Sequence, residues 1–355
     1  MGAGVRFTVF TYRETRLQSF SFEEVDLKDD SDLVTSGFPV VCCDEGIVSE
    51  DFPTVPGLCR VGGALFMVGG MLNTTKPCSK KWLWSAPPPP LPGGSSTMTW
   101  TRCDAAMDSG RLFPMVVPLH DGRVFICGGT SEPKSWVEIY DPEKGEFDRR
   151  DLPDQTLNPF PSSCFRWADH SVMLYFTRIN IKEQVSKPSL VLYDVERNNW
   201  EIFAENLPDS ELFHLDKRKL IYVGGNILFM IDQASCWFVY DLSAKKVVAK
   251  MDVRVEDGEG EVMQAFYLGN NDIQNTSWIF YIFLPEVIHR YGYTDLRYAK
   301  VEVVQGKGGD YAATVQLSGL LRVGYHTDLY IIADDASRKG AAKEELLKEK
   351  EEDEK

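Results

Sequence analysis

The sequence predicts an all-β fold assembled from repeats of roughly 50 residues. An apolar run that ends in Gly-Gly recurs at residues 66–70, 124–129 and 220–225. A Tyr-Asp dipeptide follows at residues 140–141, 193–194 and 240–241, and seven positions after each Tyr stands an apolar residue: Phe147, Trp200 and Val247. A repeat with this internal order is typical of the blades of a β-propeller.

Each repeat reads as four antiparallel strands, with alternating polarity in the outer strands and continuous apolar runs in the inner ones. The second repeat shows this order most clearly. Residues 114–119 form its innermost strand, and Asp121-Gly122 is a strong hairpin-turn signal because glycine tolerates positive φ. Residues 124–127 and 136–140 form the middle strands, residues 141–145 form a turn, and residue 146 opens the outer strand.

Repeats of this kind divide residues 1–337 into a single propeller domain. We expect complete blades at approximately 51–107, 108–153, 154–208, 209–253 and 258–306. The first blade places a turn at Gly62-Gly63, and the third replaces Gly-Gly with Tyr175-Phe176. In the fourth, residues 216–218 are expected to be the turn that precedes the second strand. In the fifth, we expect an inner strand at 278–284 and the outermost strand at 298–304.

The two ends of the chain together predict a sixth blade. Residues 314–317 and 328–333 supply only two inner strands, and residues 6–12 and 18–25 read as alternating outer strands. We therefore expect residues 308–335 and 5–28 to form one composite blade, which closes a six-bladed ring and buries both sheet edges.

Two further segments are expected outside the blades. The insertion at 86–97 is rich in Pro, Gly and Ser, so it is expected to be an exposed loop, with polyproline II recognition of its four consecutive prolines as the alternative. Residues 338–355 form a charged tail, disordered or helical, in which Glu344 and Lys348 are spaced i, i+4.

Composition restricts the class of partner. The 355-residue chain has a formal net charge of −15, which disfavours nucleic acid and anionic membranes. No apolar stretch is long enough to cross a bilayer, and the first residues lack the apolar core of a secretory signal. The eight cysteines include no C-x-x-C pair and read as reduced thiols. We expect a monomeric propeller in the cytoplasm or the nucleus.

The spacing of Gly-Gly, Tyr and Trp or Phe resembles the kelch motif, over about residues 5–335. The resemblance implies that the glycines end the second strand beside the central channel and that the aromatic residues pack between blades. The residues with these implied structural roles are Gly69, Gly70, Gly128, Gly129, Tyr140, Phe147, Tyr193, Trp200, Gly224, Gly225 and Tyr240.

The chain looks similar to plant kelch proteins, including those in which the propeller follows an F-box. That resemblance implies a protein-binding scaffold or adaptor, and a substrate-recognition module as its more specific form. Residues 1–28 read as strands, so we expect no F-box segment there and no BTB-like helical domain.

Enzymes with kelch propellers provide the alternative, an enzyme or small-molecule binder that uses the central channel. Copper radical oxidases of the galactose-oxidase type use a Tyr-His pair, and Tyr325-His326 matches that dipeptide alone. Plant specifier proteins bind iron through an E-x-x-x-D-x-x-x-H pattern, which this sequence lacks. His120, His170 and His326 fall at equivalent turns of different repeats, too far apart to share one metal. We therefore expect no catalytic residues, no metal and no cofactor.

Partner contacts are expected at turns, where the fold does not demand the residues found. Aromatic residues and Arg dominate protein interfaces, which ranks Arg166, Trp167 and Arg290 first. The full set of candidate partner-binding residues is Arg166, Trp167, His170, Lys217, Arg218, His289 and Arg290.

Overall fold

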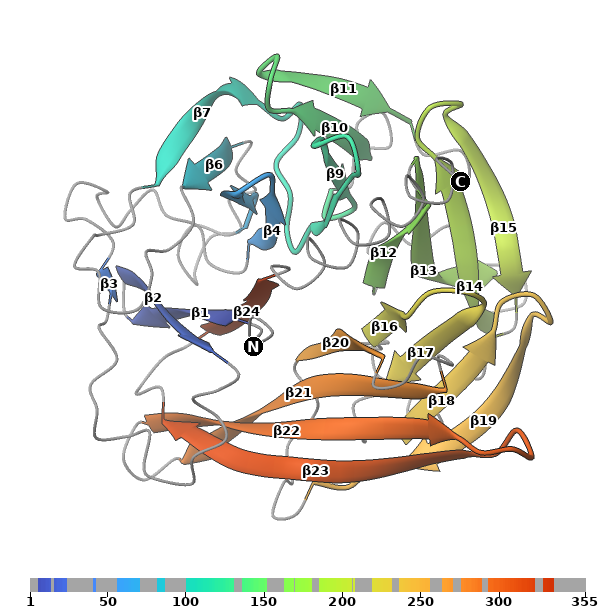
Figure 1. Ribbon diagram of the computed structural model, residues 1–355. Coiled ribbons are helices and arrows are strands. Elements are labelled where there is room, and N and C mark those ends of the chain that lie inside the picture. Colours follow the sequence, from blue (N-terminus) through green and yellow to red (C-terminus); the bar gives the residue numbers. More distant parts are fainter. Residues whose placement is uncertain are drawn as a thin grey trace, which may run out of the picture.

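The computed structural model shows strands arranged around a common centre (Figure 1). It describes residues 6–13, 16–23, 41–42, 56–70, 82–86, 100–130, 136–151, 163–168, 170–180, 185–205, 207, 219–231, 236–255, 264–270, 276–288, 293–322 and 328–334. These residues form 24 strands and contain no helix, which confirms the expected all-β class.

The strands group into six four-stranded antiparallel sheets. The first contains β4 (Gly57–Val61), β5 (Ala64–Val68), β6 (Trp82–Ala86) and β7 (Thr101–Ala106). The second contains β8 (Met115–Pro118), β9 (Val124–Cys127), β10 (Val137–Asp141) and β11 (Glu146–Arg150). The third contains β12 (Ser163–Ala168), β13 (Ser171–Asn180), β14 (Val185–Asp194) and β15 (Asn199–Glu205).

The fourth sheet contains β16 (Lys219–Tyr222), β17 (Ile227–Ile231), β18 (Cys236–Asp241) and β19 (Lys246–Asp252). The fifth contains β20 (Gln264–Asn270), β21 (Ser277–Ile288), β22 (Tyr293–Gln305) and β23 (Tyr311–Arg322). The terminal sheet has the order β24 (Asp328–Asp334), β1 (Arg6–Arg13), β2 (Arg16–Glu23) and β3 (Val41–Cys42).

The first strand of each sheet lies nearest the common centre (Figure 1). Contacts link β4 with β8, β8 with β12, β12 with β16, β16 with β20, and β24 with β4. Burial follows the same order. All four residues of β9 are buried, whereas the outer strand β11 alternates between exposed and half-buried positions. Radial sheets of this kind, with short inner strands around one axis, make the fold a β-propeller.

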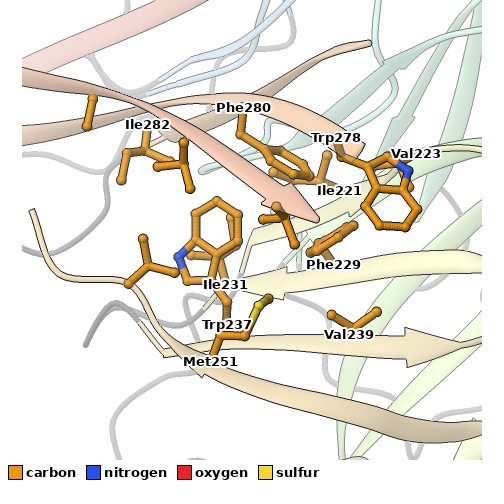
Figure 2. Close-up of a cluster of buried hydrophobic side chains, with 14 of the residues drawn as sticks. Ile221, Val223, Phe229, Ile231, Trp237, Val239, Met251, Trp278, Phe280 and Ile282 are labelled. Carbon is orange, nitrogen blue, oxygen red and sulfur yellow. The ribbon is translucent and has the colours of Figure 1, made fainter. Parts of the chain in front are cut away.

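The hydrophobic core lies between neighbouring sheets. One cluster joins the second and third sheets and includes Trp136, Phe176 and Tyr193, all essentially inaccessible to solvent. Another joins the fourth and fifth sheets, where Phe229 meets Phe280 with ring centroids 4.8 Å apart (Figure 2). Burial of large aromatic rings between these sheets therefore holds them together.

The strand assignment of the fourth repeat requires a correction. Gly224-Gly225 does not end a second strand, because β16 is the first strand of its sheet and pairs with β17, which begins at Ile227. The glycine pair lies in the turn between these strands, at φ of 98° and 58°. The predicted turn at 216–218 lies outside the described residues and precedes β16. The apolar run of β16 resembles a second strand because inner strands are also buried.

The composition of the composite blade also requires a correction. Residues 314–317, expected as an inner strand, belong to β23, which pairs with β22 at the outer edge of the fifth sheet. Burial alternates between half-buried and exposed positions over residues 311–316 of β23, as suits an outer strand. The fifth sheet thus extends to Arg322, and β22 is its third strand rather than its last. The C-terminal part contributes β24 alone to the terminal sheet, and β24 pairs with β1 over residues 6–12.

The Pro-rich insertion beyond Ala86 and the tail at 338–355 also lie outside the described residues.

Candidate partner-binding face

The turns between strands define one face of the propeller, which we call the turn face. In an antiparallel sheet the connections from first to second strand and from third to fourth strand emerge at the same end. Hydrogen bonds join these two turns within single sheets. Val195 N donates to the His170 carbonyl at 2.8 Å, and Leu242 N donates to the Asn226 carbonyl at 2.8 Å.

The Asp of each Tyr-Asp dipeptide shapes the turn after the third strand. Asp141 Oδ1 accepts hydrogen bonds from Glu143 N at 3.0 Å and from Lys144 N at 3.2 Å. Asp241 Oδ1 accepts from Ala244 N at 3.0 Å and from the backbone and hydroxyl of Ser243. These bonds stabilise the carboxylate, so they lower the pKa of Asp241, the Ala244 bond being the largest contribution. The Asp is therefore a turn former, and Asp141 stands at the start of the turn expected at residues 141–145.

The Tyr and the downstream aromatic residue pair across neighbouring strands and contact the preceding sheet. Tyr193 lies opposite Trp200, with centroids 4.3 Å apart, and Tyr193 also packs 5.6 Å from Phe125 of the second sheet. Tyr140 lies 4.9 Å from Phe147 and 6.1 Å from Phe66 of the first sheet. In the fourth sheet Tyr240 lies opposite Val247.

The true Gly-Gly pairs lie at the opposite end of the sheets. A Cβ at Gly69 would approach the Arg111 carbonyl oxygen to 2.7 Å, and one at Gly129 would collide with the Leu112 carbonyl oxygen. Both glycines have positive φ. Gly70 N donates to the Arg111 carbonyl at 2.8 Å, and Leu112 N donates to the Gly129 carbonyl at 2.7 Å. The pairs therefore accommodate the connection between the first two sheets.

A buried ion pair anchors that same connection and was not identified from the sequence. Arg111 Nη2 lies 2.8 Å from Glu138 Oε2, and both side chains are 0 % exposed. Arg111 Nη1 also donates to the carbonyls of Gly128 at 2.7 Å and Trp136 at 3.0 Å. Glu138 Oε1 accepts from Asp108 N at 2.7 Å. The only sequence signal for this ion pair was the presence of Arg111 at the start of the repeat and of Glu138 two residues before Tyr140.

Three of the seven candidate partner-binding residues lie on the turn face of the third sheet. Arg166 is exposed, and it forms no ion pair with any residue that the structure describes. His170 is exposed, and its Nδ1 lies 3.2 Å from Glu196 Oε1. Trp167 is half-buried. The other four, Lys217, Arg218, His289 and Arg290, lie outside the described residues.

Trp167 belongs to a group of four half-buried rings between the third and fourth sheets, which we call the aromatic platform: Phe165, Trp167, Phe203 and Tyr222. Trp167 lies 4.9 Å from Tyr222 and 5.9 Å from Phe203, between ring centroids. Phe165 stacks on Tyr222 at 5.7 Å. The sequence pointed to Trp167 alone because Trp167, although part of β12, stands next to the turn expected at residues 168–170.

A cation covers one end of the aromatic platform. Lys245 Nζ lies 4.6 Å from the centroid of the Phe203 ring. Lys245 stands at the last position of its turn with φ of 51°, where Gly145 and Asn198 stand in the second and third sheets. Its ammonium group forms no ion pair with the described part of the chain.

The described residues offer no metal site. No group of three or more His, Cys, Asp or Glu side chains within the described ranges could hold a metal ion. Cys59, Cys103, Cys127, Cys164 and Cys236 are free thiols. Burial raises the pKa of the Cys127 thiol well above its usual range, and the neighbouring Cys164 adds to that effect. In the described part of the chain, no helix is long and apolar enough to cross a membrane.

Comparisons with known proteins identify one motif. The family model described as the Kelch motif matches residues 111–149, a segment that begins at Arg111 and includes Glu138 and β8 to β11. No curated protein matches the sequence. Among solved structures, the chain is similar to the crystal structure of the Myceliophteria thermophila Cps50 (Swd1) beta-propeller domain, at 10% identity and a TM-score of 0.40. That match covers 80% of this chain and 98% of the domain.

The motif match and the sheet topology agree on one segment. Residues 111–149 carry the buried ion pair, the second Gly-Gly pair and the Tyr140–Phe147 contact, and they form one four-stranded sheet of the propeller. The chain is therefore a β-propeller that contains a kelch motif.

Proposed function

We propose that this chain is a protein-binding scaffold or adaptor that holds a partner on its turn face. The observation that carries the proposal is the aromatic platform, four adjoining half-buried rings between the third and fourth sheets; the third sheet also exposes Arg166 and His170 on its turn face. Aromatic residues and Arg contribute most of the binding free energy in protein interfaces. A rigid array of sheets beneath the turns holds these side chains in fixed positions.

The propeller is proposed to act by binding rather than by catalysis, in the cytoplasm or the nucleus. Its more specific form is a substrate-recognition module related to plant F-box/kelch proteins. If so, ubiquitin-ligase scaffold subunits should co-purify with the tagged chain. Their absence, with other partners retained, would remove the ligase role and leave the scaffold.

The proposed scaffold is a ring of six blades that the chain termini close. The pairing of β24 with β1 supports this closure, since it joins the two ends of the chain in one sheet. In a closed ring every sheet would have a neighbouring sheet on each side.

Affinity capture with a charge-reversal variant tests the scaffold. Arg166→Glu should remove partners that the unchanged chain retains, because Arg166 is exposed on the turn face. The matched control is Arg254→Glu, which reverses an exposed charge after β19, away from the turn between β18 and β19. Equal loss of partners in both variants, or in neither, would contradict a binding site on the turn face.

A further inference from the structure

The aromatic platform gathers four half-buried rings, whereas the described cluster between the fourth and fifth sheets has two, Tyr267 and Tyr311, and the cluster between the second and third sheets has one, Trp200. Trp136, Phe176 and Tyr193 between the second and third sheets are at most 1% exposed, and Phe229, Trp237 and Phe280 between the fourth and fifth are fully buried. All four platform rings remain half-buried. Adjacent exposed apolar groups on a soluble protein mark an interaction site more often than scattered ones.

Ring geometry restricts what the platform can bind. The rings contact one another directly, with centroid separations of 4.9 Å to 6.5 Å. A cage for a quaternary ammonium requires rings spread around a space, each within about 6 Å of the cation. Rings in mutual contact leave no such space between them, so the platform presents a continuous surface. Aromatic-lined surfaces of this kind suit the pyrrolidine rings of a polyproline II helix.

A hydrogen-bond donor accompanies the rings. The contacts of Trp167 with described residues are ring contacts, and its indole N–H donates to none of them. A polyproline II peptide has no internal hydrogen bonds, so its carbonyl oxygens face outward and need donors. The Trp167 indole can therefore supply a donor to such a backbone.

Charge beside the rings favours an acidic partner. Lys245 lies over Phe203, and its ammonium group has no carboxylate partner among the described residues. The chain as a whole carries a net charge of −15, so an unpaired cation beside the rings is contrary to the overall balance. Complementary charge raises the rate and specificity of association.

We propose that the aromatic platform binds a proline-rich peptide flanked by acidic residues, held in the polyproline II conformation. This inference rests on the proposed scaffold function and names the chemistry of its partner. Prolines would lie on Phe165, Trp167 and Tyr222, and a flanking carboxylate would pair with Lys245.

Fluorescence polarisation with a labelled synthetic peptide tests the inference. The probe is EEPPLPPEE, compared with EEAALAAEE, which keeps the charge and removes the prolines, and with KKPPLPPKK, which keeps the prolines and reverses the charge. We expect saturable binding of the first peptide and at least about tenfold weaker binding of each of the others. Equal binding of EEAALAAEE would overturn recognition of proline, and equal binding of KKPPLPPKK would overturn recognition of acidic flanks.

Variants of the full chain locate the site. Trp167→Ala should weaken binding of the probe peptide by about tenfold or more. Trp167→Phe keeps a ring and removes the indole donor, and should weaken it by about fivefold. Lys245→Gln should weaken binding of the probe peptide by a few fold. The matched control Lys250→Gln, which removes a cation 5.5 Å from the centroid of the Phe238 ring, should leave that binding unchanged. Thermal melts confirm that each variant is folded, and unchanged binding in a folded Trp167→Ala variant would refute the site.

The two proposals fail separately. If no peptide binds but Arg166→Glu still removes captured partners, the polyproline inference is wrong and the scaffold remains. If a neutral oligosaccharide such as cellohexaose shifts the Trp167 fluorescence and the peptide does not, the platform binds sugar instead. If neither capture nor peptide binding depends on the turn face, both proposals are wrong.

Discussion

At the scale of single residues, positive φ has different consequences at different glycines. Gly129 and Gly225 have φ of 74° and 58°. A Cβ at Gly129 would collide with the backbone of Leu112, whereas one at Gly225 would meet no atom within 4 Å. Position 129 therefore requires glycine for two reasons, its positive φ and the lack of space for a Cβ, whereas position 225 favours glycine only for its positive φ.

A pair of alanine variants separates these requirements. Gly225→Ala should lower the free energy of unfolding by about 1–2 kcal/mol, the cost of the left-handed conformation alone. Gly129→Ala should lower it by about 3 kcal/mol or more, because the backbone must also move. Urea denaturation measures both. An equal loss in the two variants would mean that Leu112 yields to the added methyl group without cost.

The buried Tyr193 makes stability depend on alkaline pH. Burial raises the pKa of Tyr193 from 10 to about 12, because the phenolate would be poorly solvated. Tyr193 Oη donates to Asn198 Oδ1 at 3.0 Å, which also requires the proton. The folded state therefore holds this proton more tightly than the unfolded state, and its contribution to stability is complete below pH 10 and declines from pH 10 towards pH 12.

Tyr193→Phe tests this dependence. The variant should lose about 1 kcal/mol at neutral pH, with the hydrogen bond to Asn198. Between pH 10 and about pH 12 its free energy of unfolding should fall less steeply than that of the unchanged chain. Denaturation curves over that pH range provide the measurement, and identical slopes would show that Tyr193 does not titrate differently in the folded state.

At the scale of elements, the connection before β8 depends on a buried charge pair. Arg111 bonds Glu138 and two backbone carbonyls, and its own carbonyl accepts from Gly70 of the first sheet. The Arg111 side chain thus bonds to β10 and to the end of β9, while the Arg111 backbone bonds to the first sheet. Removal of Arg111 leaves Glu138 buried with the half-exposed Arg149, 3.8 Å away, as its nearest printed cation, and removal of Glu138 takes the carboxylate from the buried Arg111.

Single and double variants measure the cost. Arg111→Met and Glu138→Gln should each lower the free energy of unfolding by about 3–5 kcal/mol, because each removes one member of a fully buried charge pair. The double variant should cost less than the sum of the two. The exposed pair of Arg254 and Asp252 is the control, and its loss should cost less than about 1 kcal/mol. A small effect of both single variants would show that water reaches the site.

At the scale of the whole molecule, the proposed closure makes the ends of the chain interdependent. β1 pairs with both β24 and β2, so it links the C-terminal strand to the N-terminal strands. If the ring is closed in this way, loss of the N-terminal strands removes most of one blade and exposes its neighbours.

Deletion of residues 1–28 tests the closure. The deletion removes β1 and β2 and should lower the unfolding midpoint of the whole chain by about 5 °C or more. Deletion of residues 338–355 is the control, since these residues lie beyond β24. A midpoint that is unchanged by loss of residues 1–28 would show that the terminal sheet does not support the rest.

Much of the fold could be predicted from local pattern. The strands of the second repeat follow from Asp121-Gly122, from the buried run of β9 and from the Tyr-Asp turn, since each of these signals acts within a few residues. In the fourth repeat the sequence predicts the run before Gly224-Gly225 as the second strand, whereas it is the first strand of its sheet. The prediction is wrong because Gly-Gly serves equally in a hairpin turn and at a crowded strand end. No local pattern distinguishes the two.

The sequence by itself determined the all-β class, the repeat and most hairpins, because turn chemistry and the period-2 alternation of strands are local properties. Tertiary structure alone decided which residues meet. It paired β23 with β22, it placed Arg111 against Glu138, and it gathered Phe165, Phe203 and Tyr222 around Trp167. These contacts join different strands and sheets, and the packing of one sheet on the next, rather than any spacing along the chain, leaves those four rings half-buried on the turn face.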